Sequence, residues 1–342
     1  MNFLITGGAG FIGSHLTERL LSQGDNVTVL DDLSTGSLDN LEAALANRRL
    51  EFLQGSILDQ ALVRKVASKA DFVIHLAAAV GVRRILKDPL SSLKVNVEGA
   101  ESVLRACADS RVPILLASTS EVYGKNEANS LCEDADSVIG SSSISRWSYA
   151  TAKKLDEFLG LAYSQTYNVP VTITRFFNIV GPRQSSRYGM VLPKFVRTAL
   201  ANEPIRVFGD GRQTRNFTYV GDCIEALMRL ISAPSATGNI FNIGGTEEIS
   251  ILELAQRVKA AARSSSQIVR IPYQEAYPEG GFEDMQRRVP CICKIQSLTG
   301  WSPSTRLEEV IRKAVVYEEQ RNFSLATLVS AVDAQSCALS VA

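Results

Sequence analysis

The chain of 342 residues is 45% hydrophobic, which is enough for one large core with a smaller lobe attached. Its 36 lysines and arginines balance 36 aspartates and glutamates, so the composition argues against nucleic acid or an anionic membrane surface as a partner, since both favour a net basic field. The sequence shows neither a basic leader with a separate apolar stretch nor a run of about 18 apolar residues, and we therefore expect a soluble, cytoplasmic protein.

Short apolar runs rich in β-branched residues alternate with longer segments of helical period over the first half of the chain. The predicted strands are 2–6, 27–31, 51–54, 72–76, 113–118 and 171–176, and the longer predicted helices are 11–23, 90–108 and 148–167. This alternation is typical of an α/β fold in which a doubly wound parallel Rossmann sheet carries helices on both faces. We expect it to form one domain over residues 1–176.

Beyond residue 176, turns rich in glycine and proline become frequent and the predicted helices become shorter. These helices are expected near 190–201, 220–232, 250–263 and 306–320. The pattern predicts a smaller, discontinuous α/β lobe over 177–320. Part of 220–245 is expected to return to the first domain, and 321–342 to form a C-terminal tail.

Six cysteines are scattered along the chain, at positions 107, 132, 223, 291, 293 and 337. Only Cys291 and Cys293 lie close together in the sequence, at a spacing unlike a zinc or redox CxxC pair. We interpret all six as reduced thiols and expect no metal site. The two histidines, His15 and His75, lie in elements of the predicted sheet domain and are interpreted as packed, hydrogen-bonded residues.

A glycine-rich turn follows the first predicted strand and leads into the first helix. Gly7, Gly10 and Gly13 have a GxxGxxG spacing, which permits a tight turn and lets backbone amides and the helix N-terminus approach a pyrophosphate. Asp31 ends the second strand, where a carboxylate accepts ribose hydroxyls and repels a 2′-phosphate. The pattern predicts NAD rather than NADP; a purely structural turn and a loop-capping Asp31 are the alternatives.

Tyr149 and Lys153 lie four residues apart at the start of a predicted helix, so their side chains share one face. A phenol with an ordinary pKa of about 10 acts as a base near pH 7 only if its pKa falls by about three units, which requires roughly 4 kcal/mol. A lysine ammonium and a nicotinamide cation can provide that stabilisation. The alternative is a pair of ordinary side chains on the helix surface.

The predicted strand 113–118 runs into the polar residues Thr119, Ser120 and Glu121. Ligands of a doubly wound sheet bind at the carboxyl ends of its strands, so this cluster and the start of the Tyr149 helix should face one crevice. We expect Thr119 or Ser120 to hydrogen-bond the reacting oxygen of the substrate there.

The motifs GGAGFIGSH, HLAA, STSEVYG, YATAK, RFFNIVGPR, GDGRQTRNFTYV and FNIGG occur in the order seen in extended short-chain dehydrogenases of the NAD-dependent nucleotide-sugar epimerase/dehydratase family. The chain resembles this family over roughly residues 1–320. The resemblance implies an NAD-binding Rossmann domain, a nucleotide-sugar lobe, and a homodimer that pairs helices 90–108 and 149–167. It also implies a catalytic cycle in which Tyr149 removes the C4 hydroxyl proton of the sugar.

The resemblance further implies two sets of binding residues. The NAD set is Gly7, Gly10, Phe11, Ile12, Gly13, Asp31, Ser56, Ile57, Leu76, Ala77, Asn96, Tyr149 and Lys153. The UDP-sugar set is Asn178, Arg187, Val191, Gln213, Arg215 and Arg288. The arginines have an independent rationale, because planar guanidinium forks suit a diphosphate. Ser56 and Cys291 are departures, since aspartate is frequent in the family at both positions.

The residues after Thr119 separate the reactions of this family, all of which begin with oxidation at C4. Dehydratases carry Asp-Glu there and simple 4-epimerases a small or apolar residue in place of Glu121, whereas this chain has Ser120-Glu121. Together with Arg287–Pro290, this pattern resembles the UDP-glucuronate decarboxylases (UDP-xylose synthases). In their chemistry the 4-ketone turns the C6 carboxylate into part of a β-keto acid, which loses carbon dioxide and gives UDP-xylose or a UDP-4-keto-pentose.

We hypothesise that Glu121 either disfavours the charged ground state or handles the C5 proton; a carboxylate that only caps the following turn is the alternative. Two other functions stay open. A UDP-sugar 4-epimerase acting on UDP-glucuronate or UDP-glucose shares the first step, and a non-catalytic NAD-binding scaffold needs no chemistry. The presence of both Tyr149 and Lys153 favours an enzyme. Arg146 and Trp147 either close over the substrate or fill the seam between the lobes.

Overall fold

A seven-stranded parallel sheet forms the centre of the computed structural model, which describes residues 1–185, 190–277, 283, 285–321 and 323. In spatial order its strands are β11 (Ile240–Ile243), β6 (Val171–Phe176), β5 (Ile114–Thr119), β4 (Phe72–His75), β1 (Asn2–Thr6), β2 (Asn26–Asp31) and β3 (Leu50–Gln54). Every pairing is parallel. The predicted doubly wound α/β fold is thereby confirmed.

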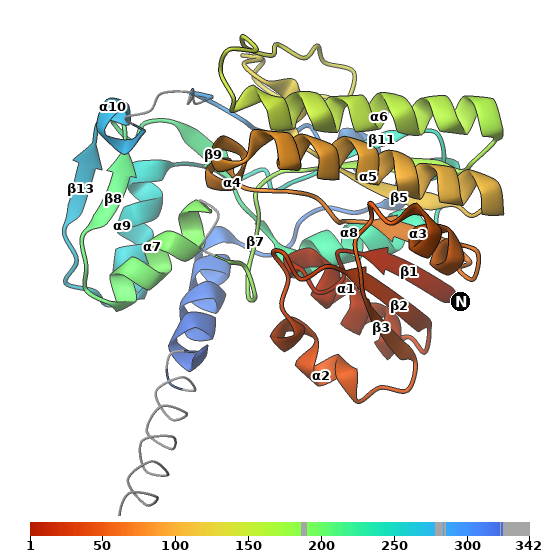
Figure 1. Cartoon of the computed structure of the whole chain (residues 1–342). Helices are drawn as coiled ribbons and strands as arrows, with labels where there is room; N and C mark the ends of the chain where they lie inside the picture. Colours follow the sequence, from red (N-terminus) through yellow and green to blue (C-terminus); the bar gives the residue numbers. More distant parts are fainter. Residues whose placement is uncertain (186–189, 278–282, 284, 322, 324–342) are drawn as a thin grey trace, which may run out of the picture.

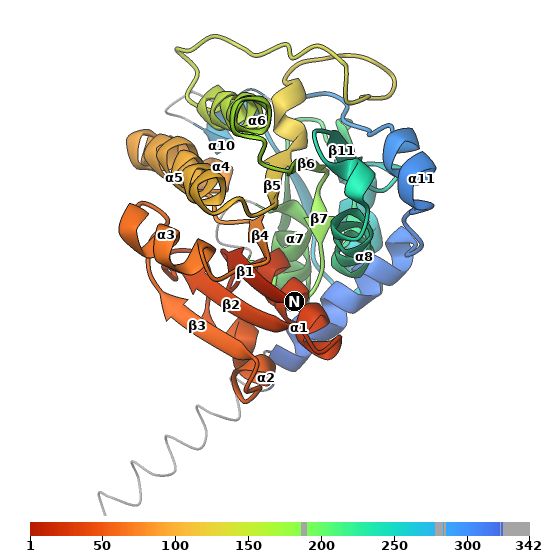
Figure 2. The ribbon, with the colours of Figure 1, turned by 90° about the vertical axis from the view of Figure 1, so that its right-hand side faces the viewer.

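Helices cover both faces of this sheet (Figure 2). One face carries α3 (Gln60–Ala67), α5 (Pro89–Ser110) and α6 (Trp147–Tyr167), and the other carries α1 (Phe11–Ser22), α8 (Val220–Ile231) and α11 (Cys293–Thr299). Apolar side chains such as Val103 and Leu104 on the first face, and Leu16 and Leu227 on the second, are completely buried. Each such burial contributes roughly 1.5–3 kcal/mol. Because helices cover both faces of the sheet, its strands are buried on both sides and their sequences are continuous apolar runs.

The direction of winding reverses between β1 and β4. From β1 the chain moves outward to β2 and β3, then crosses back to β4 and continues to β5, β6 and β11. The loops after β1 and β4 therefore diverge at the carboxyl edge of the sheet, where doubly wound folds hold their ligands. Shorter segments complete this half: α2 (Glu42–Leu45), α4 (Val82–Lys87) and the 3-10 turns η1 (Leu38–Leu41), η2 (Ser120–Tyr123) and η3 (Pro234–Ala236).

A second core lies beside the sheet, on the left of Figure 1. Its elements are α7 (Val191–Leu200), β8 (Ile205–Phe208), α9 (Ile251–Ala261), β13 (Ile268–Ile271) and a helix over residues 307–321. β8 and β13 pair in parallel, and side chains such as Val196, Leu254 and Val310 are fully buried between the elements. Connecting elements are β7 (Ile179–Val180), β9 (Thr214–Asn216), β10 (Thr218–Tyr219), β12 (Glu248–Ser250) and α10 (Tyr273–Ala276).

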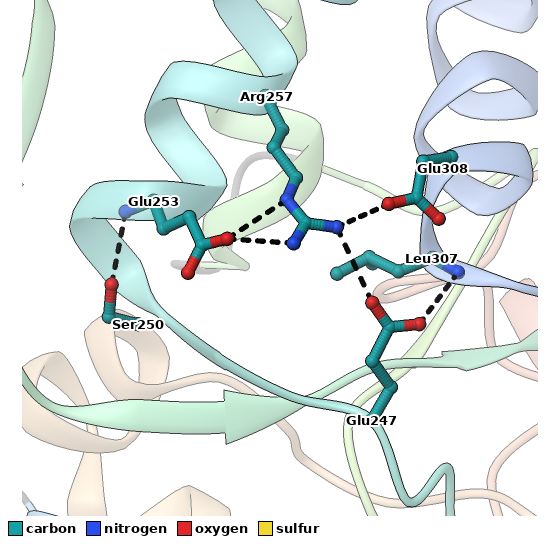
Figure 3. A network of polar contacts seen from close by, with 6 residues as sticks. All are labelled: Glu247, Ser250, Glu253, Arg257, Leu307 and Glu308. Atoms are coloured by element: carbon teal, nitrogen blue, oxygen red, sulfur yellow. Dashed lines mark hydrogen bonds and ion pairs between the residues drawn. The ribbon is translucent and has the colours of Figure 1, made fainter.

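A network around Arg257 attaches the helix over residues 307–321 to α9 (Figure 3). Arg257 contacts Glu253 at 2.7 Å, Glu247 at 3.4 Å and also Glu308. The other carboxylate oxygen of Glu247 accepts a hydrogen bond from the backbone N–H of Leu307. A network in which several carboxylates share one guanidinium stabilises this attachment more than isolated surface ion pairs would. It matters here because the attached helix carries residues that line the central cavity.

No helix in the described ranges is long and apolar enough to cross a membrane. Most of the segment interpreted as a C-terminal tail, and the substrate-set residue Arg187, lie outside the described residues.

Candidate active site

A cavity of about 770 Å³ opens at the carboxyl edge of the sheet and extends to the second core. It brings together residues far apart in the chain, including the glycine turn, the end of β5, the start of α6 and the segment around Arg288. Sequence reasoning did not single out several further wall residues, among them Arg183, Lys194, Phe208, Tyr273 and Tyr317. Their aromatic and basic types carry no spacing signal that separates them from surface residues.

The glycines after β1 let the N-terminus of α1 pack closely against β1 and the loop after β4. Gly7 has φ +75, and a Cβ placed on it would lie 2.7 Å from the backbone N of Ala77. A Cβ on Gly13 would lie 2.3 Å from the carbonyl O of Gly7. The N-cap residue is Gly10, which has no side chain to cap α1, and Gly10 and the first residues of α1 line the cavity. These features fit the pyrophosphate of a dinucleotide.

Asp31 lies at the end of β2 beside this turn and is buried. Its two carboxylate oxygens accept hydrogen bonds from the backbone N–H groups of Ala9, at 3.0 Å, and Leu33, at 2.8 Å. Burial raises the pKa of Asp31, against the lowering effect of those two amides. The carboxylate lines the cavity where the ribose of a dinucleotide bound at the glycine turn would lie, so the donor set fits NAD.

The remaining residues of the predicted NAD set divide into two groups. Phe11, Ile12, Ile57, Leu76 and Ala77 line the cavity together with the glycines, Tyr149 and Lys153. Ser56 and Asn96 are not among the lining residues. The Ser56 hydroxyl accepts a hydrogen bond from the backbone N–H of Leu58, and the Asn96 amide pairs with both backbone groups of Ala79, at 2.8 and 3.2 Å. Asn96 thus holds the loop after β4 in place without lining the cavity.

Tyr149 and Lys153 share the inner face of α6, as the spacing predicts. The pKa of Tyr149 is raised by burial and by the charges of Glu121 and Asp156, against a hydrogen bond with Thr119 that lowers it. Lys153 is buried and its ammonium donates to Asp156 at 2.8 Å. Asp156 is completely buried, and its other oxygen has no hydrogen-bond partner in the described part of the chain. Asp156 was missed from the sequence, although its i, i+3 spacing to Lys153 was a usable signal.

His75, at the end of β4, is buried close enough to Lys153 for the lysine charge to affect its pKa. Burial and the Lys153 ammonium lower the pKa of His75 to about 3, so the ring is neutral at physiological pH. Its Nδ1 is 2.7 Å from the hydroxyl oxygen of Thr6. His75 therefore contributes a hydrogen bond between β1 and β4 and no charge to the site.

The carboxylate of Glu121 lies between two buried guanidinium groups. One oxygen is 3.1 Å from Nη2 of Arg146, and the other accepts a hydrogen bond from Nη1 of Arg288. Burial by itself would raise the pKa of Glu121, but the charges of Arg146 and Arg288 outweigh it and lower the pKa to about 2. Arg288 also donates to the side-chain oxygen of Asn178 at 2.8 Å, and Asn178 has a left-handed backbone with φ 41.

The other predicted substrate residues surround this arrangement. Val191 lies at the start of α7, Arg215 lies within β9 and Gln213 directly precedes that strand. Arg215 and Gln213 are buried, and all three residues line the cavity. The amide of Gln213 donates to the backbone oxygen of Phe208, at 3.1 Å, and to the hydroxyl of Tyr273, at 3.0 Å. Thr119 and Ser120 also line the wall, within the same cavity as Tyr149.

Among known proteins, the model of the NAD dependent epimerase/dehydratase family matches residues 3–244 of this chain. A UDP-N-acetyl-alpha-D-glucosaminuronate decarboxylase from Bacillus cytotoxicus is 39% identical over 313 residues, covering 91% of this chain and 96% of that protein. UDP-glucuronic acid decarboxylase 1 from Danio rerio is 35% identical over 314 residues, covering 92% of this chain and 72% of that protein. A solved structure of UDP-glucuronic acid 4-epimerase from Bacillus cereus, in complex with UDP-glucuronic acid and NAD, superposes with a TM-score of 0.85 and 29% identity, covering 94% of this chain and 99% of that one.

Proposed function

Because the chain belongs to the NAD dependent epimerase/dehydratase family, we propose that it is an NAD-dependent decarboxylase of UDP-glucuronate, forming UDP-xylose or a UDP-4-keto-pentose. The observation that carries the proposal is the Glu121 carboxylate, paired with Arg146 and Arg288, in the cavity that Tyr149 also lines. Decarboxylases of two UDP-hexuronates are among the relatives that cover more than nine-tenths of this chain.

The first step assigned to this chain is removal of the C4 hydroxyl proton by Tyr149. Thr119 and Ser120 hold the 4-oxygen through their hydroxyls. Lys153 lies next to Tyr149 on the inner face of α6. NAD held at the glycine turn would supply the hydride acceptor for oxidation at C4, and its nicotinamide cation would lower the pKa of Tyr149. Burial and the charges of Glu121 and Asp156 raise the pKa of Tyr149, and an added positive charge acts against that shift.

The second step is loss of the C6 carboxylate as carbon dioxide once C4 is a ketone. A carboxylate that enters beside Arg146 and Arg288 meets guanidinium groups whose charge Glu121 already balances in part. Two like unit charges about 4 Å apart at an effective dielectric constant of about 20 repel by about 4 kcal/mol. Breaking the C5–C6 bond releases carbon dioxide and leaves the electron pair in a C4–C5 enolate, which takes a proton from water at C5. The negative charge thereby moves away from Glu121, which relieves this repulsion. With a pKa of about 2, Glu121 is ionised, which favours this role over donation of the C5 proton.

The substituent at C2 of the sugar defines a second candidate substrate, UDP-N-acetylglucosaminuronate. Its support is the relative from Bacillus cytotoxicus, which is 39% identical and acts, by its name, on that sugar nucleotide. Both substrates carry the same C6 carboxylate and the same C4 hydroxyl, so the roles assigned to Tyr149 and Glu121 apply to either.

The test is proton and carbon NMR of the purified protein with NAD and each UDP-hexuronate labelled with ¹³C at C6. Release of labelled carbon dioxide, with new anomeric signals of a UDP-pentose, supports the proposal, and the ratio of rates identifies the preferred C2 substituent. Conversion of UDP-glucuronate to UDP-galacturonate with retention of label makes the chain a 4-epimerase. Tight NAD binding without turnover of these substrates or UDP-glucose makes it a binding scaffold.

We also propose a homodimer formed through α5 and α6. These helices lie next to each other on one face of the sheet (Figure 1). Their exposed side chains include Leu90 (64%), Leu155 (43%) and Phe158 (61%), which a second copy of the chain would cover. Light scattering after size exclusion should give twice the chain mass for the wild type and the chain mass for Phe158→Glu.

We further propose that residues 1–176, with part of 220–245, bind the NAD and that 177–320 bind the nucleotide sugar. The support is the position of β11 within the central sheet and the separate apolar core over α7, α9 and the helix at 307–321. We place the enzyme in the cytoplasm, in keeping with the free thiols of all five cysteines in the described ranges.

A further inference from the structure

Three cysteines that the sequence scatters come together next to the candidate active site. Cys132 lies between η2 and α6, Cys291 follows the segment that carries Arg288, and Cys293 begins α11. The Cys291 thiol raises the pKa of both Cys132 and Cys293, which places the three thiols near one another. We refer to these three residues as the thiol cluster.

The backbone places Cys132 and Cys291 opposite each other. The N–H of Leu131 donates to the carbonyl of Val289 at 2.9 Å, and the N–H of Cys291 donates to the carbonyl of Leu131 at 3.0 Å. These bonds form a parallel bridge between Leu131 and Pro290, so Cys132 and Cys291 are each one residue further along. Adjacent parallel segments are about 4.8 Å apart, within the Cα separation of about 4.4–6.8 Å that disulfides require.

Neighbouring side chains hold the bridge between Leu131 and Pro290 in place. The amide of Asn242 donates to the carbonyls of Leu131, at 2.8 Å, and Cys291, at 3.1 Å. The side-chain oxygen of Asn242 accepts from the hydroxyl of Tyr123 at 2.8 Å. The two thiols are thus kept in register by bonds that do not involve sulfur, which favours a crosslink with little backbone movement.

We propose that Cys132 and Cys291 are an oxidisable dithiol that a peroxide converts to a disulfide. One thiolate attacks the O–O bond of hydrogen peroxide, giving a sulfenic acid and releasing one oxygen as water. The second thiol then attacks that sulfur, forming the S–S bond and releasing the sulfenic oxygen as a second water. Two electrons pass from the two sulfurs to the peroxide, and both thiol protons end in water.

Accessibility and acidity set where and how fast this reaction occurs. Cys132 and Cys291 are partly exposed, whereas Cys107 and Cys223 are buried in the core. Contact with the Cys291 thiol, with burial adding to it, raises the pKa of Cys132 to about 11. Because the thiolate is the reactive form, oxidation should be slow near pH 7 and faster as the pH rises.

The crosslink acts on the candidate site through Arg288, which lies three residues before Cys291 and contacts Glu121. A Cys132–Cys291 disulfide joins the Arg288 segment to the chain that follows Glu121 and restricts rearrangement of Arg288 around an entering carboxylate. This effect on turnover rests on the proposed function, whereas formation of the disulfide does not. Oxidised enzyme should turn over more slowly and melt at a higher temperature.

The test compares full-length wild type with Cys132→Ser, Cys291→Ser and the matched control Cys293→Ser. Each protein is treated with hydrogen peroxide at pH 8, its remaining thiols are alkylated, and its peptides are mapped without reduction. Cys337, which lies outside the described residues, is followed as its own peptide. The expected result is a linked 132–291 peptide pair within one chain in wild type and in the control. A melting temperature several degrees higher should accompany it, reversed by dithiothreitol and missing from the Cys132 and Cys291 variants.

Different failures have different meanings. Oxidation confined to Cys293, or thiols at positions 132 and 291 that stay fully alkylatable, overturns the proposed disulfide. A linked peptide pair with unchanged turnover of the linked enzyme overturns the coupling to Arg288. Failure of the proposed function itself shows as lack of turnover by the reduced enzyme, which the peptide map does not depend on.

Discussion

Replacement of Glu121 by glutamine removes one charge from the centre of the site and keeps its shape. In the wild type the carboxylate has 18% of its side-chain surface exposed and contacts Arg146 and Arg288, which are 6% and 8% exposed. Glutamine offers one acceptor oxygen, and its amide nitrogen faces a guanidinium that also only donates. At position 121 the two buried cations then meet one neutral acceptor in place of a carboxylate.

The cost to stability follows from the pKa of Glu121, which falls from 4.5 to about 2. At 1.36 kcal/mol for each pKa unit, the folded state gains about 3 kcal/mol from ionised Glu121. Because the folded pKa lies below the unfolded one, this gain is complete above about pH 4.5 and is lost as the pH falls toward about 2. Glu121→Gln should lower the free energy of unfolding by about 3 kcal/mol at pH 7 and by progressively less below pH 4.5.

The catalytic effect is separate and should fall on kcat. Removing the charge that repels the C6 carboxylate removes up to about 4 kcal/mol of ground-state destabilisation, equivalent to as much as about a thousandfold in rate. KM should stay the same or fall, because Arg146 and Arg288 no longer pair with a carboxylate at position 121 and attract the substrate carboxylate more strongly. Release of ¹⁴CO₂ from carboxyl-labelled UDP-glucuronate gives both constants.

Glu248→Gln is the matched control. Glu248 pairs with Arg287, next to Arg288 in the chain, through two contacts of 2.8 Å, and neither residue lines the cavity. Its replacement should leave kcat within a factor of about two, as expected for a partly exposed pair. Wild-type kcat in Glu121→Gln, or an equal loss in Glu248→Gln, would refute the electrostatic role.

Three further predictions concern the base and the cofactor. Tyr149→Phe should lower kcat by roughly 10²–10⁴-fold while calorimetry shows NAD still bound, and activity near wild type would move the base elsewhere. Asp156→Asn removes a charge that raises the pKa of Tyr149, so the acidic limb of the kcat profile should move to lower pH by roughly one unit; an unmoved limb would leave Asp156 a structural partner of Lys153. Asp31→Asn should reduce the preference for NAD over NADP in kcat/KM by roughly tenfold, and an unchanged ratio would assign that preference to other residues.

Local patterns predicted the strands and long helices of the first half with differences of a few residues at their ends, but they did not predict α3, β11 or α11. The strand predicted at 171–176 is β6 without change, and the helix predicted at 148–167 begins one residue earlier, at Trp147. Burial on both faces makes the sequence of a parallel strand continuously apolar. The helical period of apolar residues distinguishes the α6 segment from the segments on either side of it. The turn at Gly7 and the pair Tyr149 and Lys153 were found for the same reason, because each needs a short fixed spacing.

The sequence by itself thus determined the doubly wound fold class, the dinucleotide turn and the Tyr149 face of α6, since all are encoded within a few residues. Only the tertiary structure decided that Glu121 is ionised between Arg146 and Arg288, and that Cys132 meets Cys291. Glu121 and Arg288 are 167 residues apart, and no period or spacing connects them. Their contact, and therefore the charge state of the site, exists only once the packed sheet brings the two segments to the same edge.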